Sequence, residues 1–334
     1  MEKVFIYGAG NMGKAVLELL SNRCEVKGFI DGNLALQGSR ISGVPVYHLS
    51  NMDSTDKLCD AVLVAMTVCP FTKMKEILSE CGFHCIVPAG DYVAEQYIYD
   101  EILNTWKFQG EYDTLSFSDE KSIYDYNTAC QWFSQRTDKD WNLEDNKYFP
   151  IFLSSHLSQC RVMVDTAALD GGYIDAFLQK NTDRYVYAHI LTPSTLSINS
   201  LREKYSPHHV HFFENEASEK DGTENCRRIG LMQPFTKDKT YHISTQKIDS
   251  SMKNTVFDYL RCYSMSEILP ILQGGEQTIQ QYRPIIAANI GHYKSDFFQV
   301  PLYLMKQCLD YKFYFRMHSY QGNDCILYAV PDEK

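Results

Sequence analysis

The sequence lacks a long apolar run and an excess of basic residues. No apolar stretch in it approaches the roughly 18 residues that a membrane-spanning helix needs. Its 32 Lys and Arg are outnumbered by 42 Asp and Glu, which gives a formal net charge of -10. Binding to a nucleic acid or to an anionic membrane surface requires clustered cations. We therefore expect neither a nucleic-acid partner nor a membrane partner.

Metal-type spacing of cysteines and histidines is also missing. The 11 cysteines are scattered, and the pair Cys81 and Cys85 has no second pair at zinc-site distance. The odd count, without a leader sequence, favours free thiols and a cytoplasmic location. Within His208–His211, strand alternation would put His209 and His211 on one face. No carboxylate is placed to join them, so we expect no metal site.

The length and the apolar content predict two domains. A chain of 334 residues exceeds the size at which one hydrophobic core usually stops growing, and 44% of its residues are apolar. We expect α/β domains over residues 1–95 and 159–334, joined by residues 96–158. Within that middle segment, Ile123 to Gln135 carries apolar residues at helical spacing. This helix is either a connector that covers the second sheet or a lid over the second site.

The first domain begins with a short buried strand, a glycine-rich turn and a helix, in the order of a dinucleotide-binding fold. The turn glycines are Gly8, Gly10 and Gly13. Asp31 ends the next strand, 18 residues after Gly13, where a carboxylate can accept hydrogen bonds from a ribose. Further β-α alternation predicts a doubly wound, Rossmann-like parallel sheet. The glycines either bind a phosphate or serve the turn and its packing alone.

The segments that follow the glycine turn narrow the ligand class. Residues 29–33 and 41–46 resemble the N-terminal nucleotide-sugar-binding domain of bacterial sugar acyltransferases and polysaccharide-biosynthesis proteins. That resemblance implies a nucleotide or nucleotide-sugar at the glycine loop, or a relic of such a site. Hydride transfer from a nicotinamide is less favoured, because the chain supplies no Tyr-x-x-x-Lys pair after a suitable strand.

The second domain also alternates strands and helices, but two strands close in sequence are predicted at its end. Its first strand ends at Asp165, a loop of small residues follows, and a helix begins near Ile174. The strands predicted last, at 312–316 and 325–330, are close enough in sequence to form an antiparallel pair. Alternating elements with a terminal hairpin look like the sheet of class I methyltransferases. The predicted fold class is thus α/β, with two doubly wound domains.

Three segments of this domain resemble the FkbM-type methyltransferases: residues 164–171, residues 272–287, and residues 291–320. The resemblance implies S-adenosylmethionine as the methyl donor and O-methylation of a sugar or related hydroxyl, in glycan or natural-product biosynthesis. The substrate would be a small molecule or a glycan, and the oligomeric state stays open, a homo-oligomer included. The positions implied to contact the cofactor are Asp165, Thr166, Ala167, Asp170, Gly171, Asn215 and Ala217.

Methyl transfer to a hydroxyl needs alignment of donor and acceptor and a group that takes up the proton. His292 follows a predicted strand at its carboxyl end, where ligands bind in such sheets. It is the first candidate for the base, and His318 is the second. Each is alternatively an ordinary hydrogen-bonded histidine in the wall of the domain.

The sequence departs from the FkbM pattern at positions that would contact the cofactor. Ala167 stands where the family has a glycine, and Ile190 stands where it has the acidic residue that binds the ribose. Tyr263–Ser266 matches the family's Asp-Ile-Glu-Gly run and lacks both carboxylates. These changes support an alternative, in which a catalytically degenerate methyltransferase fold acts as a ligand-binding or interaction protein. Whether the chain is an active enzyme stays open at this point.

Overall fold

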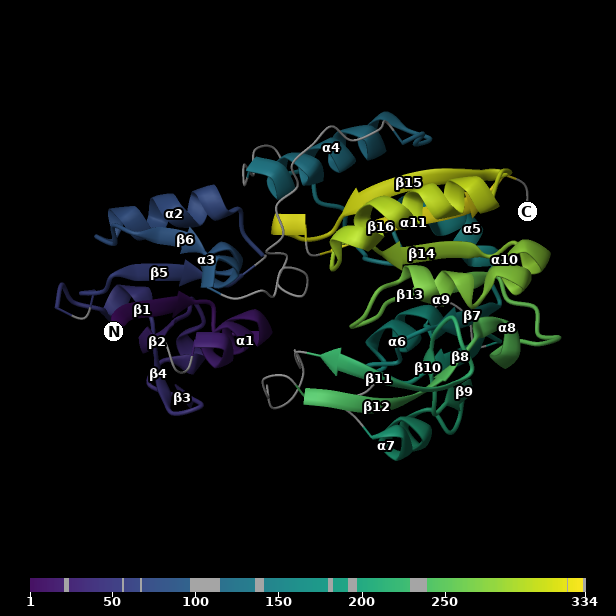
Figure 1. The fold of residues 1–334 in the computed structure, drawn as a ribbon, viewed down its shortest axis with the longest axis horizontal. Helices are drawn as coiled ribbons and strands as arrows, with labels where there is room; N and C mark the ends of the chain where they lie inside the picture. The colour runs from purple at the N-terminus through teal and green to yellow at the C-terminus, as the bar shows by residue number, and fades with distance from the viewer. Residues whose placement is uncertain are drawn as a thin grey trace.

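The computed structural model describes residues 1–20, 24–55, 57–66, 68–96, 115–135, 141–179, 183–191, 197–228, 239–322 and 324–332. These residues form two α/β units, each built around a sheet of mostly parallel strands (Figure 1). This confirms the predicted fold class of two doubly wound domains.

The first unit is a six-stranded sheet with the order β3-β4-β2-β1-β5-β6, parallel except at β3. Its strands are β1 (Glu2–Tyr7), β2 (Cys24–Ile30), β3 (Arg40–Ile41), β4 (Val44–Tyr47), β5 (Ala61–Val64) and β6 (Ile86–Pro88). Its helices are α1 (Asn11–Leu20), α2 (Phe71–Glu80) and α3 (Ala89–Gln96). Side-chain alternation divides the core: Val4 and Ile6 pack with α1, and Phe5 packs with α2.

The second unit is a seven-stranded sheet with the order β15-β16-β14-β13-β7-β8-β9. Its strands are β7 (Val162–Asp165), β8 (Tyr185–His189), β9 (His209–Phe213), β13 (Tyr259–Cys262), β14 (Ile285–Asn289), β15 (Tyr311–Met317) and β16 (Cys325–Pro331). Strand β16 runs antiparallel to both of its neighbours, so the predicted terminal hairpin is confirmed. The sequence order reverses at β7, in the middle of the sheet, which makes its carboxyl end the expected ligand position.

Helices cover both faces of this sheet. Met163 and Tyr259 lie on the face packed by α5 (Ser154–Gln159), α6 (Gly172–Leu178) and α7 (Ile198–Lys204). Val164 and Leu260 lie on the opposite face. The helices on that face are α8 (Ile248–Ser251), α9 (Leu269–Gln273), α10 (Glu276–Tyr282) and α11 (Lys294–Gln307).

A small sheet, which the sequence did not predict, follows β9. It consists of β10 (Glu216–Ala217), β12 (Lys239–Gln246) and β11 (Gly222–Arg228), in that order. Strand β11 reads Gly-Thr-Glu-Asn-Cys-Arg-Arg and has no apolar alternation. Its antiparallel pairing with β12 forms it, and a pattern search along one strand cannot detect such pairing.

Helix α4 (Glu120–Gln135) lies along β15 at the top of Figure 1. Its Tyr126 ring stacks on Phe297 with 4.9 Å between the ring centroids, and Ser122 Oγ accepts a hydrogen bond from Phe315 N at 3.0 Å. The helix therefore covers the second sheet, as the connector interpretation expects. Within the remaining predicted connector, residues 97–114 and 136–140 lie outside the described residues.

Asp125, on the buried face of α4, gives a testable prediction for stability. Its Oδ2 accepts a hydrogen bond from Lys121 Nζ at 2.9 Å, and its Oδ1 has no partner. Burial raises the pKa of Asp125 to about 6, so the folded state loses stability as the pH rises from about 4 through 6. We expect Asp125→Asn to stabilise the protein by about 1–2 kcal/mol at pH 8 and to change little at pH 4. Urea unfolding of this variant at both pH values, beside the exposed control Asp310→Asn, is the measurement; equal effects at the two pH values would contradict the expectation.

The two units meet near the end of β15. Gln321 Nε2 donates a hydrogen bond to the carbonyl oxygen of Met66, just beyond β5, at 2.7 Å. Gln321 has a φ of 64°, in the left-handed region. Gly322 is equally constrained, since a Cβ there would lie 2.5 Å from the Phe133 ring. A strained turn thus supplies a contact between the units.

The described part of the chain was expected to hold no membrane-spanning helix, no paired cysteines and no metal site. No helix there is long and apolar enough to cross a membrane. The described cysteines carry free thiols, and no group of three or more potential ligands could hold a metal ion in those residues. His209 and His211 do share one face of β9, where they stack on Tyr185 and Tyr187 at 4.5 and 5.0 Å between ring centroids.

Candidate functional site

A buried ion pair lies at the carboxyl end of β7. Asp165 and Arg261 of β13 lie on the face of the sheet that α6 covers, and their side chains are 1% and 0% exposed. Arg261 Nη1 lies 2.5 Å from Asp165 Oδ1 and 2.9 Å from the carbonyl oxygen of Ala167. Burial alone would lower the pKa of Arg261, but the carboxylate of Asp165 raises it by more. The pKa of Arg261 is therefore above its usual value, and the guanidinium stays charged.

The turn after Asp165 is fixed by its own hydrogen bonds. Ala167 N donates to Asp165 Oδ1 at 2.9 Å, and Thr166 Oγ1 donates to the carbonyl oxygen of Tyr263 at 2.7 Å. The positive φ angles in this turn are those of Leu169 (48°) and Gly171 (85°). Ala167 is not among the residues of positive φ, so its Cβ carries none of the strain that a required glycine would imply.

The turn is lined by an apolar cluster. Ala167, Leu191 and Met265 are buried together, and Leu169 and Tyr263 pack against them. Three of these residues, Ala167, Tyr263 and Met265, occupy positions where the FkbM pattern has a glycine or a carboxylate. Departures on two distant segments of the sequence, at Ala167 and at 263–265, therefore meet at one place in the fold.

These residues do not fit S-adenosylmethionine in the position that the resemblance implies. A donor bound there needs acceptors for its ribose hydroxyls, and burying a hydroxyl without a partner is costly. Ile190 is half-buried and has no acceptor in its side chain. The turn holds two carboxylates: Asp165 is buried and already bound by Arg261, and Asp170 is exposed and accepts a hydrogen bond from Gly172 N.

The other residues predicted to contact the cofactor have structural partners. Asp170 Oδ1 accepts a hydrogen bond from Gly172 N at 2.9 Å. A Cβ on Gly171 would lie 2.1 Å from the Tyr205 hydroxyl, so packing requires that glycine. Asn215 Nδ2 donates to Ser244 Oγ at 2.7 Å, and Ala217 pairs with β12 in the small sheet. Their roles toward a ligand stay predictions.

A polar cluster lies at the same edge of the sheet, where β14 ends and β16 begins. Lys147 forms an ion pair with Asp324, and Asn289 Nδ2 lies 3.4 Å from both Asp324 Oδ1 and His292 Nε2. Burial opposes the charge of Asp324, yet Lys147 holds the pKa of Asp324 below its usual range. Burial lowers the pKa of His292 to about 4, so its imidazole is neutral at pH 7. The structure therefore places the first candidate base among charged groups.

His318 is bound on both sides. Its Nδ1 lies 2.7 Å from the carbonyl oxygen of Glu144, and its Nε2 lies 2.8 Å from the Tyr328 hydroxyl. With Nδ1 donating and Nε2 accepting, both ring nitrogens of the neutral tautomer are satisfied. Burial lowers the pKa of His318 to about 4. This geometry suits a structural histidine in the wall.

Sequence reasoning missed Arg261, Lys147 and Asp324. A signal existed for Arg261, which is the basic residue inside an apolar strand and is fully buried. Charged residues are almost never fully buried without a partner. Lys147 and Asp324 are far apart in sequence: the pairing of β16 with β14 places Asp324 beside Asn289, and the hydrogen bonds of Glu144 to Met317 and His318 hold the segment that carries Lys147 nearby.

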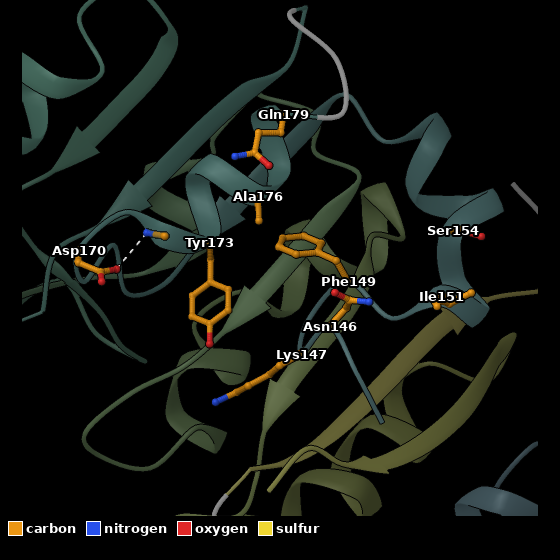
Figure 2. Close-up of a pocket in the computed structure, with 10 residues that line it drawn as sticks. Asn146, Lys147, Phe149, Ile151, Ser154, Asp170, Tyr173, Ala176 and Gln179 are labelled. Atoms are coloured by element: carbon orange, nitrogen blue, oxygen red, sulfur yellow. Dashed lines mark hydrogen bonds between the residues drawn. The ribbon is translucent and has the colours of Figure 1, made fainter. Parts of the chain in front are cut away.

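A pocket of about 810 Å³ opens beside these clusters, between α6 and residues 146–154 (Figure 2). Phe149, Tyr173 and Ala176 give it apolar walls, and Asn146 and Lys147 add polar groups. In Figure 2 the hydroxyl end of Tyr173 points toward the Lys147 side chain. The pocket has the size and mixed lining of small-molecule sites.

The glycine loop of the first unit is built as predicted. A Cβ on Gly8 would lie 2.7 Å from the Ala65 carbonyl oxygen, and one on Gly13 would lie 1.9 Å from the Gly8 carbonyl oxygen. A Cβ on Gly10 would meet no atom within 4 Å, so the packing does not require that glycine. Asp31 accepts hydrogen bonds from Ala9 N and Asn33 N, both at 2.8 Å, and so holds the loop. A nucleotide there stays a prediction.

A solved structure resembles this chain in fold, whereas comparison of the sequence alone finds no match. No protein-family model and no curated protein matches the sequence. The solved structure of the methyltransferase FkbM from Methylobacillus flagellatus KT matches with a TM-score of 0.66 and 14% identity, over 98% of this chain and 90% of that chain. The chain shares its fold with FkbM. At this identity the match concerns the fold alone.

The UDP-D-quinovosamine 4-dehydrogenase of Vibrio fischeri matches over 28% of this chain and 85% of its own, with 21% identity and a TM-score of 0.23, too low to support an argument. The FkbM-like fold therefore rests on the first match and on the strand order. Both domains are covered by that match.

Proposed function

We propose that this methyltransferase-like protein binds a small-molecule ligand and does not transfer a methyl group. The observation that supports this proposal is the apolar cluster of Ala167, Leu169, Leu191, Tyr263 and Met265 at the carboxyl end of β7. It replaces the two carboxylates that the FkbM pattern places there with the phenol of Tyr263 and the thioether of Met265, which lack the negative charge that binds ribose hydroxyls most strongly. The ligand site that we assign instead is the pocket beside α6.

Titration calorimetry with S-adenosylmethionine tests this proposal. Charge-assisted hydrogen bonds contribute about 1.5–3 kcal/mol each, so each lost one weakens binding roughly 10- to 100-fold. We expect no saturable heat at donor concentrations of about 1 mM. A one-to-one binding isotherm in that range, or methyl transfer to any acceptor hydroxyl, would overturn the proposal.

Methyl transfer to a sugar hydroxyl is the second candidate, and the placement of His292 favours it. His292 lies beside the pair of Lys147 and Asp324 at the sheet edge where ligands bind. A neutral imidazole at pH 7 can accept a proton. A radiolabelled-methyl assay with His292→Gln as the comparison distinguishes the two functions, because only an enzyme would lose label incorporation.

A further inference from the structure

We infer that the pocket beside α6 takes a sugar acid, whose carboxylate is bound by Arg261, Tyr148 and Lys147. The inference deepens the proposed function, on which it rests, by naming the ligand class. Its basis is a set of buried polar atoms without partners next to the pocket. Such atoms are rare in folded proteins, and each needs an explanation.

Arg261 presents an unused edge. Its Nη1 is bound to Asp165 and to the backbone at Ala167, whereas its Nε and Nη2 are buried and have no hydrogen-bond partner. These two nitrogens form one edge of the planar guanidinium. The two oxygens of a carboxylate match such an edge, and this is the geometry in which Arg binds acids most strongly.

Tyr148 supplies a third unused group. Its side chain is fully buried, and its hydroxyl has no partner. The Arg261 Cζ lies 4.4 Å from its ring centroid, and the Lys147 Nζ lies 5.2 Å from it. Tyr148 also has a φ of 70°, a strained angle for a bulky residue, and such strain concentrates at functional sites. A hydroxyl and a guanidinium edge both donate, so an acceptor is the missing partner.

Tyr173 connects this group to the pocket. Its ring lines the pocket (Figure 2). The centroid of this ring lies 4.1 Å from Arg261 Cζ. The residue is half-buried on the first turn of α6. The inferred site requires the Tyr173 ring to turn away from Arg261, which would open the guanidinium to the pocket.

The rest of the lining indicates what the carboxylate is attached to. Phe149 offers an apolar ring, while Asn146, Ser154 and Gln179 offer amides and a hydroxyl. This mixture suits a ring with several hydroxyl groups. Arg261 is paired with Asp165 and Lys147 with Asp324, and Asp170 adds a carboxylate to the lining that forms no ion pair among the described residues. A singly charged carboxylate therefore fits this charge balance better than a doubly charged phosphate.

The test compares D-glucuronate, D-glucose and inorganic phosphate by titration calorimetry on the full chain, up to about 10 mM. Glucuronate and glucose share a ring and differ at one carbon, so they isolate the carboxylate. We expect one-to-one binding of glucuronate and at least about tenfold weaker binding of the other two. Equal binding of glucose, preference for phosphate, or no binding of glucuronate would each overturn the inference.

Tyr148→Phe is the decisive variant. Because the hydroxyl has no partner in the free protein, its removal should leave the fold intact and should not lower the melting temperature. We expect glucuronate binding to weaken about tenfold. The matched control is Tyr311→Phe, which removes a buried hydroxyl bound to the Pro284 carbonyl oxygen at 3.1 Å and should leave binding unchanged. Unchanged binding in Tyr148→Phe would show that water alone fills the site.

The two proposals fail separately. If glucuronate does not bind and S-adenosylmethionine does not bind either, the sugar-acid inference falls and the loss of donor binding stands. If S-adenosylmethionine binds, the proposed function falls regardless of the sugar acids.

Discussion

Arg261→Met is expected to lower the free energy of unfolding by about 3–5 kcal/mol, because it leaves the carboxylate of Asp165 buried and unpaired. The pair is shielded from water, with side chains 0% and 1% exposed. Removing Asp165 as well should recover much of the loss, since a buried pair replaced by apolar residues is often neutral. Urea unfolding at pH 7 of Arg261→Met, Asp165→Leu and the double variant, beside the unchanged protein, completes a double-mutant cycle.

Arg283→Met is the matched control. Arg283 Nη1 lies 3.1 Å from Asp310 Oδ2, but the side chains are 38% and 72% exposed. Solvent screens such a pair, so its loss should cost less than about 1 kcal/mol. Similar losses in Arg261→Met and Arg283→Met would mean that burial does not govern the Asp165 pair.

Acid should unfold the protein through its buried histidines, and His189 is the best placed to show this. His189 is fully buried, its Nδ1 lies 3.0 Å from the Asn215 carbonyl oxygen, and its Nε2 lies 3.2 Å from Ser251 Oγ. One nitrogen donates and the other accepts, which suits the neutral ring. Burial lowers the pKa of His189 to about 4, from the usual value of about 6.5 for a histidine. The unfolded chain therefore binds a proton first, and stability falls as the pH drops from about 6.5 to 4.

Between about pH 6.5 and 4, this histidine should lower the free energy of unfolding by up to about 3 kcal/mol. His189→Gln keeps one donor and one acceptor and does not titrate, so its stability should depend less steeply on pH. Chemical unfolding of both proteins between about pH 4 and 7 measures the difference. His211→Gln, at an exposed position on β9, is the control and should leave the slope unchanged. An unchanged slope in His189→Gln would contradict the expectation.

The fold was largely accessible from the sequence, because its main strands are short buried runs separated by helices. Residues 4–7 and 285–290 are examples, and they correspond to β1 and β14 within a residue or two. The terminal hairpin followed from two apolar runs close in sequence. The small sheet could not be predicted, because the polar strand β11 exists only through its partner β12.

The site was accessible only in part. The sequence identified Asp165 as the end of the first strand and marked Ala167 and Tyr263–Ser266 as departures. It could not show that Arg261, 96 residues away from Asp165, ends beside it, because that depends on the register of β13 against β7. The convergence of Ala167, Tyr263 and Met265 needs the same register. Long-range registers of this kind have no signature in a single sequence.

The apolar cluster at the end of β7 has a consequence for how the protein can change over time. Restoring one acidic residue, for example at Met265, would place a lone charge among Ala167, Leu191 and Tyr263, which costs several kcal/mol. Several positions would have to become polar together before any of them gained a partner. The apolar surroundings therefore make any single acidic substitution at this end of β7 unfavourable, whichever of these positions receives it.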